Sequence, residues 1–288
     1  MPTSKLSAVE TARRDCVPRS TPRGHEAAYG RDTMAELILV IPCFNEVSRL
    51  PVATFDRFFA EHPEVRFVFV NDGSTDATGE LLAGMQAANP GVVHLLELDT
   101  NRGKGEAVRQ GMLHALRTGA EYIGYWDADL ATPLEVLADF RMLLHECPEL
   151  DLVMGSRVPL LGRSVDRRPC RQIGGRMFAA AAALVLGVSV YDTQCGAKLF
   201  RVSDRTVSLL GHPFCSRWAF DVELLARLLA SRGGPVFGRR YLYEYPLPRW
   251  SDVAGSKMRA WHMAQATLDL ARIFLRNRLR PYLDTAIA

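Results

Sequence analysis

The chain has 288 residues, of which 48% are hydrophobic and 23% are charged. That composition is ordinary for a folded globular protein, and it excludes a wholly disordered chain, a coiled coil and a collagen-like repeat. The net charge is only +3, from 35 basic and 32 acidic residues, so charge gives no reason to expect a nucleic-acid-binding protein.

Neither the N-terminal residues nor the cysteines carry a targeting or metal-binding pattern. Residues 1–34 are polar and aperiodic, so we expect a flexible N-terminal extension without a signal peptide, and Met34 is a candidate start. The six cysteines form no C-x-x-C pair, which favours free thiols in a reducing compartment. The longest apolar run, Met177–Val190, is shorter than the roughly 20 residues of a membrane span, so we expect no bilayer crossing.

From Glu36 onward, short apolar runs alternate with helical stretches. In chain order, the pattern predicts a strand at 36–42, a helix at 49–61, a strand at 65–72, a helix ending near 88, a strand at 92–98, a helix at 105–118, a strand at 122–127, a helix opened by Pro133 and a strand at 151–156. Alternation at this spacing forms βαβ units, so we predict an α/β fold with a mostly parallel central sheet flanked by helices.

The second half of the chain is less regular. We expect a buried or lipid-facing helix at about 171–186, a loop over 192–200, a helix from about Trp218, an added strand at 241–247 and a last helix at about 257–280. The last helix has an apolar stripe beside arginines, a pattern typical of helices that lie in a membrane surface. We therefore predict peripheral association with the cytoplasmic face of a membrane; the alternative is a helix packed on its own domain.

Polar residues cluster where the predicted parallel strands end, which is where such sheets bind ligands. The strongest cluster is Asp127 and Asp129, one residue apart at the end of an apolar strand. Two such carboxylates suit a hard divalent cation, which can neutralise the charge that grows on a departing diphosphate. The alternative is a turn whose aspartates cap the following helix.

The neighbouring strand ends carry further candidates for a nucleotide site. Glu46 and Asp72 are acceptors suited to a base N–H and a ribose hydroxyl, although the segment after Asp72 also fits a simple turn and helix cap. Lys104 lies between two glycines before a helix, which suits contact with an anion. Because Val108 occupies the last glycine position of a dinucleotide fingerprint, a dehydrogenase or a phosphate-loop NTPase is disfavoured.

In this order and spacing, P-x-x-N-E, N-D-G-S-T-D, N-x-G-K-G-x-A-V-R-x-G and D-A-D resemble family 2 glycosyltransferases of the GT-A fold. The later segments GSR, YDTQCGAKLF, RWAFDVELL and W-x-x-x-x-GSK resemble the dolichyl-phosphate glucosyltransferase and mannosyltransferase branch, the glucosyl type more closely. The resemblance spans about 36–280. It implies a GT-A (Rossmann-like) domain at 35–255, followed by a C-terminal amphipathic helix and tail at 256–288.

The resemblance implies an inverting hexosyltransferase that serves protein glycosylation. The donor would be a nucleotide sugar, with UDP-glucose expected, the acceptor a polyprenyl or dolichyl phosphate that acts as nucleophile, and the cofactor Mg²⁺ or Mn²⁺. Three alternatives stay open: a GDP-mannose donor, a soluble or glycan acceptor, and a non-catalytic nucleotide-sugar-binding scaffold at the membrane. No nucleic-acid partner is expected.

The family's roles transfer to matching positions of this chain. The nucleotide sugar would be held by Pro42, Asn45, Glu46, Asp72, Lys104 and Asp127. The metal would be held by Asp127 and Asp129, with Asp129 as the main ligand. Ala131 stands where some mannosyl relatives have glutamine, so a third side-chain ligand is lacking there.

An ionised phosphate acceptor attacks without a dedicated general base, but it needs cations that hold it in line. Arg157, Arg171 and Lys198 match the acceptor-phosphate positions, and we take Asp129, Arg157 and Lys198 as the catalytic set. The alternative for the arginine-rich stretch 157–176 is a solvated basic loop.

The segment RWAFDVELL holds three further candidates whose roles stay open. Asp221 and Glu223 either orient the sugar or the acceptor, or support Arg217 and its loop. Trp218 either stacks on a sugar face or belongs to the core.

Overall fold

A computed structural model describes residues 37–166, 169–253, 265 and 268–276, apart from the side chains of residues 169–173. The elements are β1 (Leu37–Cys43), α2 (Val52–Glu61), β2 (Val65–Asp72), α3 (Thr78–Ala88), β3 (Val93–Leu98), α4 (Lys104–Leu116), β4 (Tyr122–Trp126), α5 (Val136–Glu146), β5 (Leu152–Ser156), β6 (Ser164–Asp166), α6 (Pro169–Leu186), β7 (Ala197–Arg201), α7 (Asp204–Leu210), α8 (Phe220–Ser231), α9 (Pro235–Gly238), the 3₁₀ helix η1 (Arg239–Tyr241), β8 (Leu242–Pro246) and β9 (Arg249–Ser251). Residues 268–276 are also helical. The predicted extension 1–34, the predicted boundary at 255/256 and most of the predicted last helix lie outside the described residues.

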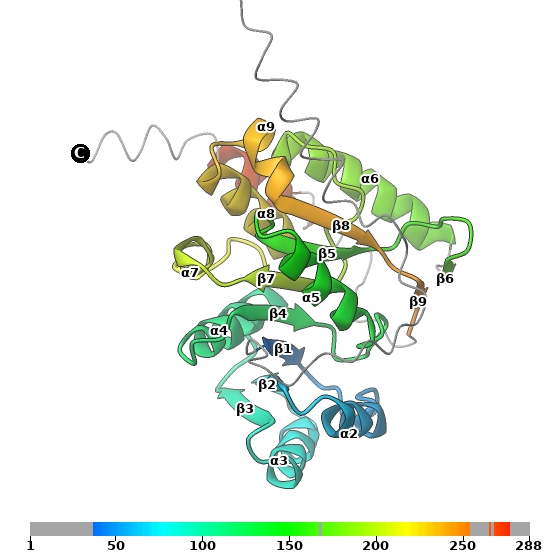
Figure 1. The fold of residues 1–288 in the computed structure, drawn as a ribbon, viewed down its shortest axis with the longest axis vertical. Coiled ribbons are helices and arrows are strands. Elements are labelled where there is room, and N and C mark those ends of the chain that lie inside the picture. Colours follow the sequence, from blue (N-terminus) through cyan, green and yellow to red (C-terminus); the bar gives the residue numbers. More distant parts are fainter. Residues whose placement is uncertain (1–36, 167–168, 254–264, 266–267, 277–288) are drawn as a thin grey trace, which may run out of the picture.

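A seven-stranded sheet runs through the centre of the molecule in the order β3-β2-β1-β4-β7-β5-β8 (Figure 1). Strands β1 to β4 are parallel to one another, and β8 is parallel to β5. Strand β7 is antiparallel to both of its neighbours, β4 and β5. The predicted α/β fold with a mostly parallel sheet is therefore confirmed. No helix within the described residues has the length and hydropathy of a membrane-spanning segment.

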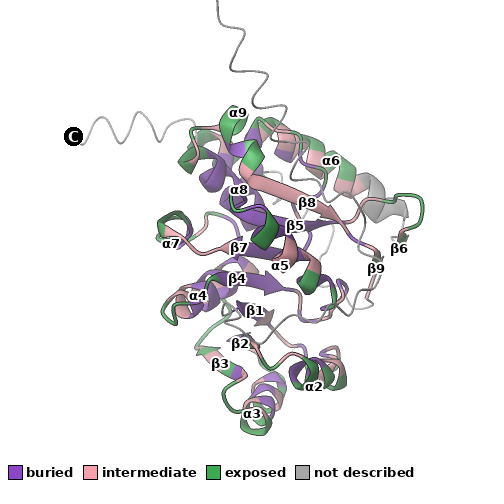
Figure 2. Ribbon diagram, in the orientation of Figure 1, coloured by how far each residue is buried: buried purple, intermediate pink, exposed green. Residues whose placement is uncertain are grey.

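Helices cover both faces of the sheet, because successive strand residues point to opposite sides. Leu39 of β1 packs in the core on the side of α2, α3 and α5. Its neighbour Val40 packs in a second core with α4, α6, α7 and α8. Figure 2 shows the central strands β4, β5 and β7 coloured as buried, whereas the edge strand β8 is coloured as intermediate and the helices carry exposed outer residues. The continuous apolar run of the first strand, buried on both faces, is explained by this sandwich.

One predicted loop contains a strand. Residues 192–200 were expected to form a loop, but β7 begins at Ala197 and pairs with β4 and β5. A lysine within a short apolar run favours an exposed loop in a sequence-based prediction. In the structure, however, the Lys198 side chain is fully buried. Because β7 runs antiparallel to β4, its first residue lies beside the last residue of β4, Trp126. The segment before β7 is thereby brought to the carboxyl ends of the parallel strands.

Several helices begin later than predicted. Helix α2 starts at Val52 rather than at Arg49, because the residue before Pro51 is disfavoured in the helical conformation. The backbone N–H groups of Arg49 and Leu50 instead donate to the Glu46 carbonyl in a turn. Helix α5 starts after Pro133, at Val136, and α8 starts two residues after Trp218.

The four cysteines whose side chains are described, Cys43, Cys147, Cys195 and Cys215, are free thiols. This agrees with the expectation for these four; the side chains of Cys16 and Cys170 lie outside the description.

Helix α4 lies close against the sheet at a glycine. A β-carbon at Gly111 would overlap the side chain of Val40 on β1, and it would stand 2.8 Å from a methyl group of Val70 on β2. By contrast, Gly84 of α3 has no atom within 4 Å of that position.

We predict that Gly111→Ala lowers the free energy of unfolding by about 1–3 kcal/mol, because the added methyl group overpacks the helix–sheet contact. Gly84→Ala is the matched control and should raise it by up to about 1 kcal/mol, since it only restricts the unfolded chain. Urea denaturation monitored by circular dichroism measures both. Equal effects of the two substitutions would contradict the close contact.

Candidate active site

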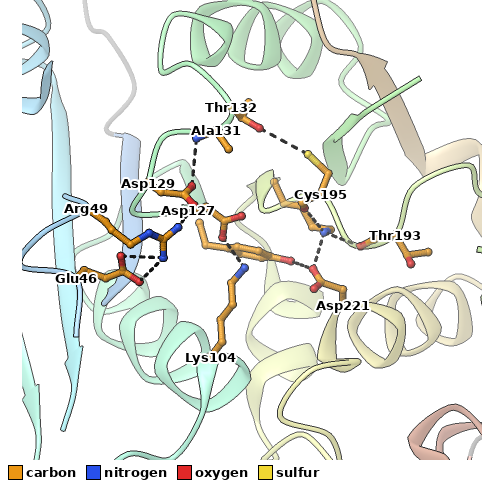
Figure 3. A network of polar contacts seen from close by, with 12 residues as sticks. Glu46, Arg49, Lys104, Asp127, Asp129, Ala131, Thr132, Thr193, Cys195 and Asp221 are labelled. Atoms are coloured by element: carbon orange, nitrogen blue, oxygen red, sulfur yellow. Dashed lines mark hydrogen bonds and ion pairs between the residues drawn. The ribbon is translucent and has the colours of Figure 1, made fainter. Parts of the chain in front are cut away.

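The candidate site lies where β1, β2 and β4 end and where the segment before β7 crosses their edge. Asp127 and Asp129 follow β4 directly, and their side chains keep 33% and 21% of their surface exposed. Figure 3 shows them between a basic side chain from α4 and another from the turn after β1. The acidic pair is thus reachable from solvent at the carboxyl edge of the sheet, as the sequence predicts.

Asp127 is held by a lysine and by close backbone packing. The Lys104 ammonium, at the start of α4, donates to its Oδ1 atom. Burial raises the pKa of Asp127, but Lys104, with help from Arg157 and Lys198, outweighs burial and lowers it overall. On the other side, any side chain at Gly196 would overlap the Asp127 carboxylate. Asp127 is therefore ionised, and only glycine fits beside it.

Asp129 carries the opposite shift. Its Oδ2 atom accepts a hydrogen bond of 2.7 Å from Arg49, and its Oδ1 atom accepts one of 3.2 Å from the backbone N–H of Ala131. Burial, followed by the negative charge of Asp127, raises the pKa of Asp129. The two carboxylates repel each other at this partly buried edge of the sheet. The nearby cations Arg49 and Lys104 offset only part of the rise in the pKa of Asp129.

Arg49 belongs to the site although no motif pointed to it. It donates from Nη1 to Glu46, at 3.3 Å, and from Nη2 to Asp129. Its position three residues after Glu46 in a turn is the only signal the sequence offers. Glu46, predicted to hold the nucleotide, therefore contacts a cation that also touches the predicted metal ligand.

Asn45 joins the loops that follow β1 and β2. Its backbone N–H donates to Ser74 at 3.0 Å, and its Oδ1 accepts the N–H of Thr75 at 2.8 Å. Its φ of 51° lies in the left-handed region, where asparagine is better tolerated than most residues. Pro42 is half-buried near the end of β1, opposite Val70.

Asp72, at the end of β2, is buried and serves the loop before α4. Its two oxygens accept the backbone N–H groups of Arg102, at 2.7 Å, and Gly103, at 2.8 Å. Burial raises the pKa of Asp72, and these hydrogen bonds offset only part of that effect. In this structure both oxygens of Asp72 hold the loop before α4. The contact of Asp72 with a nucleotide stays a prediction.

Arg157 follows β5 and is fixed on two sides. Its Nε and Nη2 atoms donate to the two oxygens of Asp192, at 2.6 and 2.7 Å, and its guanidinium lies 5.3 Å from the ring centre of Trp250. Burial disfavours the charged form, but Asp192 outweighs burial and raises the pKa of Arg157. The side chain keeps 14% of its surface exposed, so part of the charged guanidinium stays reachable although its Nε and Nη2 atoms are held by Asp192.

Lys198 is placed differently from the sequence prediction. It is fully buried, and its ammonium donates to the carbonyls of Thr193 and Cys195, at 3.0 and 2.8 Å, and to Asp221 at 2.5 Å. The Tyr125 hydroxyl also donates to Asp221. All three N–H groups of Lys198 are used, so contact with an acceptor phosphate would require one of these bonds to be exchanged. The side chain of Arg171 lies outside the described residues.

The remaining candidates support their own surroundings. Glu223 is buried; it accepts the N–H of Cys215 at 2.7 Å and pairs with Arg227 at 2.7 Å. Asp221 is occupied by Lys198 and Tyr125. Trp218 is half-buried, just before α8. Of the two open interpretations for Asp221 and Glu223, these contacts fit the supporting one.

The acidic and basic groups share one region of the molecule. Lys104, Arg157 and Lys198 all lie near enough to lower the pKa of Asp127. Within the described part of the chain, no group of three or more His, Cys, Asp or Glu side chains is placed to hold a metal. A cation here would thus have two carboxylates from the protein and would take its other ligands from elsewhere.

Comparison with known sequences places the chain among transferases. The family model described as glycosyl transferase family 2 matches residues 38–205. The chain is 32% identical over 246 residues to a dolichyl-phosphate beta-glucosyltransferase of Trichomonas vaginalis, covering 81% of this chain and 69% of that protein. The dolichyl-phosphate beta-glucosyltransferase of Drosophila melanogaster is 35% identical over 266 residues, covering 84% of this chain and 75% of that protein. A polyprenol monophosphomannose synthase of Mycolicibacterium smegmatis is 31% identical over 259 residues, covering 89% and 93%.

Solved structures share the fold. Glucosyl-3-phosphoglycerate synthase from Mycobacterium tuberculosis, solved with Mn²⁺, UDP-glucose and phosphoglyceric acid, superposes with a TM-score of 0.59 at 16% identity, covering 84% of this chain and 79% of that chain. The same protein solved with UDP alone gives the same TM-score.

We predict that Lys198→Met lowers the free energy of unfolding by about 3–5 kcal/mol, because it leaves the Asp221 carboxylate buried without its cation. The double variant Lys198→Met with Asp221→Leu should recover part of this loss, since no lone charge then remains. Urea denaturation of the wild type, of Lys198→Met, of Asp221→Leu and of the double variant gives the double-mutant cycle. A loss below about 1 kcal/mol for Lys198→Met would contradict a structural role for the pair.

Proposed function

Because the chain belongs to glycosyl transferase family 2 and is a glycosyltransferase, we propose that it transfers glucose from UDP-glucose to a polyprenyl phosphate. The observation that carries the proposal is the half-buried but solvent-reachable carboxylate pair, Asp127 and Asp129, beside the permanently charged Arg157. The names of the curated relatives support a lipid phosphate as acceptor, and the UDP-glucose bound by a structural neighbour supports the donor.

The residues present fit a divalent cation. Both candidate ligands offer hard carboxylate oxygens, and a cation would favour the ionised form of Asp129, whose pKa is raised by burial and then by the charge of Asp127. We propose that Asp127 and Asp129 hold Mg²⁺ or Mn²⁺, as the Mn²⁺-bound structural neighbour suggests. When bound, the cation neutralises the charge that develops on the leaving diphosphate.

The transfer step needs positioning more than acid–base chemistry. A phosphate oxygen of the acceptor forms a bond to C1 of glucose while the bond from C1 to the diphosphate oxygen breaks, so the anomeric configuration inverts. One negative charge moves from the acceptor to UDP, and no proton transfer is required. Arg157 is held by Asp192 and Trp250 near enough to Asp127 to lower the pKa of that carboxyl, so its charge suits the acceptor phosphate, and Lys104 suits the diphosphate.

Lys198 supports this site from the protein interior through backbone hydrogen bonds. It holds the carbonyls of Thr193 and Cys195, which flank the turn to Gly196, and Gly196 packs against Asp127. We propose that Lys198 places the acidic pair through this backbone.

GDP-mannose is the alternative donor. The polyprenol monophosphomannose synthase relative favours it, since that alignment covers 93% of the relative's length.

We also propose that the protein binds peripherally to the membrane that holds its lipid acceptor. Exposed apolar side chains occur on the loop after Arg157 and on α6, α9 and the helical segment 268–276; they are Leu160, Leu161, Met177, Leu184, Val236, Phe237, Leu268 and Leu275. Figure 2 shows exposed surface along α6 and α9, and a β-carbon at Gly187, just after α6, would stand 3.0 Å from Pro235 of α9. Segment 268–276 also buries Leu270 and Ile273 in the domain core, so this helix packs on its own domain and still exposes an apolar stripe.

We predict that radiolabelled UDP-glucose, incubated with the protein, polyprenyl phosphate and Mn²⁺, yields a labelled lipid, and that EDTA abolishes the product. Asp129→Asn should reduce the rate by about a hundredfold or more, because charge stabilisation of the leaving diphosphate is lost. GDP-mannose runs in parallel as the competing donor. Labelled lipid from GDP-mannose alone would overturn the choice of donor, and undiminished transfer in EDTA would overturn the metal.

We predict that the wild-type protein sediments with anionic liposomes at low salt and that Met177→Asp with Leu184→Asp weakens this about tenfold, because charges replace exposed apolar side chains. Val207→Asp is the control: Val207 is an exposed apolar side chain on α7, a helix that carries no member of the apolar set, and this variant should bind like wild type. Absence of wild-type binding would contradict the peripheral association.

A further inference from the structure

The loop formed by residues 101–103 leads into α4 and therefore determines where Lys104 enters the site. On its inner side, this 101–103 loop is held by Asp72, which accepts two of its backbone N–H groups. Gly103 has a φ of 93°, a conformation that side chains rarely adopt. Asp72, at the end of β2, therefore fixes the conformation of the 101–103 loop on its inner side.

On its outer side, the 101–103 loop is covered by Arg217, which comes from the segment before α8. The Nη2 atom of Arg217 donates to the carbonyl and to the side-chain oxygen of Asn101, both at 2.7 Å, and Nε donates to the carbonyl of Arg102 at 3.1 Å. A β-carbon at Gly103 would stand 2.6 Å from Nε of Arg217. The guanidinium lies across the loop and satisfies carbonyls that face solvent.

The backbone on either side of Arg217 is held by a buried serine. Ser216 accepts the N–H groups of Trp218, at 3.2 Å, and Ala219, at 2.8 Å, and so closes the turn into α8. Its own hydroxyl donates to Asp269 at 2.6 Å. Asp269 belongs to the helical segment 268–276 and is buried, with 3% of its surface exposed. This hydrogen bond joins the segment to the turn that carries Arg217, and Arg276 of the same segment donates to the Cys215 sulfur beside that turn, at 2.5 Å.

We propose that Arg217 is a positioning residue for the nucleotide-sugar subsite and that helical segment 268–276 sets its place through the Asp269–Ser216 hydrogen bond. The proposal rests on the proposed function in one respect, namely that Lys104 contacts the donor. Arg217 acts through the 101–103 loop rather than on the reacting atoms. Helical segment 268–276 thereby helps to position the donor subsite and also carries exposed apolar side chains, Leu268 and Leu275.

The geometry requires a fork and not merely a positive charge. Arg217 reaches two successive carbonyls and one side-chain oxygen from two nitrogen atoms, whereas a lysine ammonium is a compact point donor on a flexible stem. Arg217→Lys should therefore behave like Arg217→Ala in this role. Because the Arg217 side chain is exposed, neither substitution is expected to prevent folding.

The test combines amide hydrogen exchange with donor kinetics on the full chain. In Arg217→Ala and Arg217→Lys, we expect exchange at the amides of Arg102 and Gly103 to rise about tenfold, the equivalent of losing one or two net hydrogen bonds. The KM for the nucleotide sugar should rise about tenfold while kcat changes less than about twofold, since the lost effect is on binding.

Variants of the buried link test the second half of the proposal. Ser216→Ala and Asp269→Ala should raise exchange at Arg102 and Gly103 as Arg217→Ala does, and Asp269→Asn, which keeps an acceptor oxygen, should restore the wild-type rate. Arg272→Ala is the matched control, because Arg272 is exposed and touches only the other oxygen of Asp269, at 3.1 Å. Its exchange rate and KM should equal those of wild type.

Unchanged exchange and unchanged KM in Arg217→Ala would overturn the proposal. A change in Arg217→Ala without one in Ser216→Ala and Asp269→Ala would overturn the link to segment 268–276, as would an equal change in Arg272→Ala. If the wild type transfers hexose from neither donor, the proposed function fails, but the exchange rates still decide whether Arg217 and Asp269 order the loop.

Discussion

Two half-buried carboxylates, Asp127 and Asp129, and the cations around them set the charge balance at the carboxyl edge of the sheet. The two aspartates follow a strand that is buried on both faces, so their backbone has little freedom to move apart. Burial, and then the charge of Asp127, raises the pKa of Asp129. The protein answers with cations from two different elements, Lys104 at the start of α4 and Arg49 in the turn before α2. Negative charge is concentrated at a solvent-accessible edge and only partly neutralised, which suits a divalent cation with its diphosphate.

A second set of buried polar groups keeps this edge in place. Lys198 ties the segment before β7 to α8 through Asp221, and Gly196 of that segment packs against Asp127. Arg157 is held by Asp192 near enough to Asp127 to lower the pKa of that carboxyl. Buried charges of this kind are costly unless each is paired. Their pairing here fixes the relative position of acidic and basic groups that come from distant parts of the chain.

Much of the fold was predictable because strands buried on both faces are continuous apolar runs, and helices follow them at regular spacing. The placement of Asp127 and Asp129 at a strand end followed from the same pattern. Strand β7 was missed because a buried lysine breaks its apolar run, and only tertiary contacts with Asp221 and two carbonyls explain that lysine. Arg49 was missed because its partner Asp129 lies eighty positions away in the sequence. Periodicity reports local structure, whereas ion pairs between distant loops depend on how the sheet brings them together.

We propose that one site holds a cation at the acidic pair and a lipid phosphate at Arg157. A crystal structure with Mn²⁺, UDP and a short-chain polyprenyl phosphate tests it most directly. We expect metal density at Asp127 and Asp129 and the acceptor phosphate at the Arg157 guanidinium. Metal bound elsewhere, or an acceptor phosphate remote from Arg157, would contradict it.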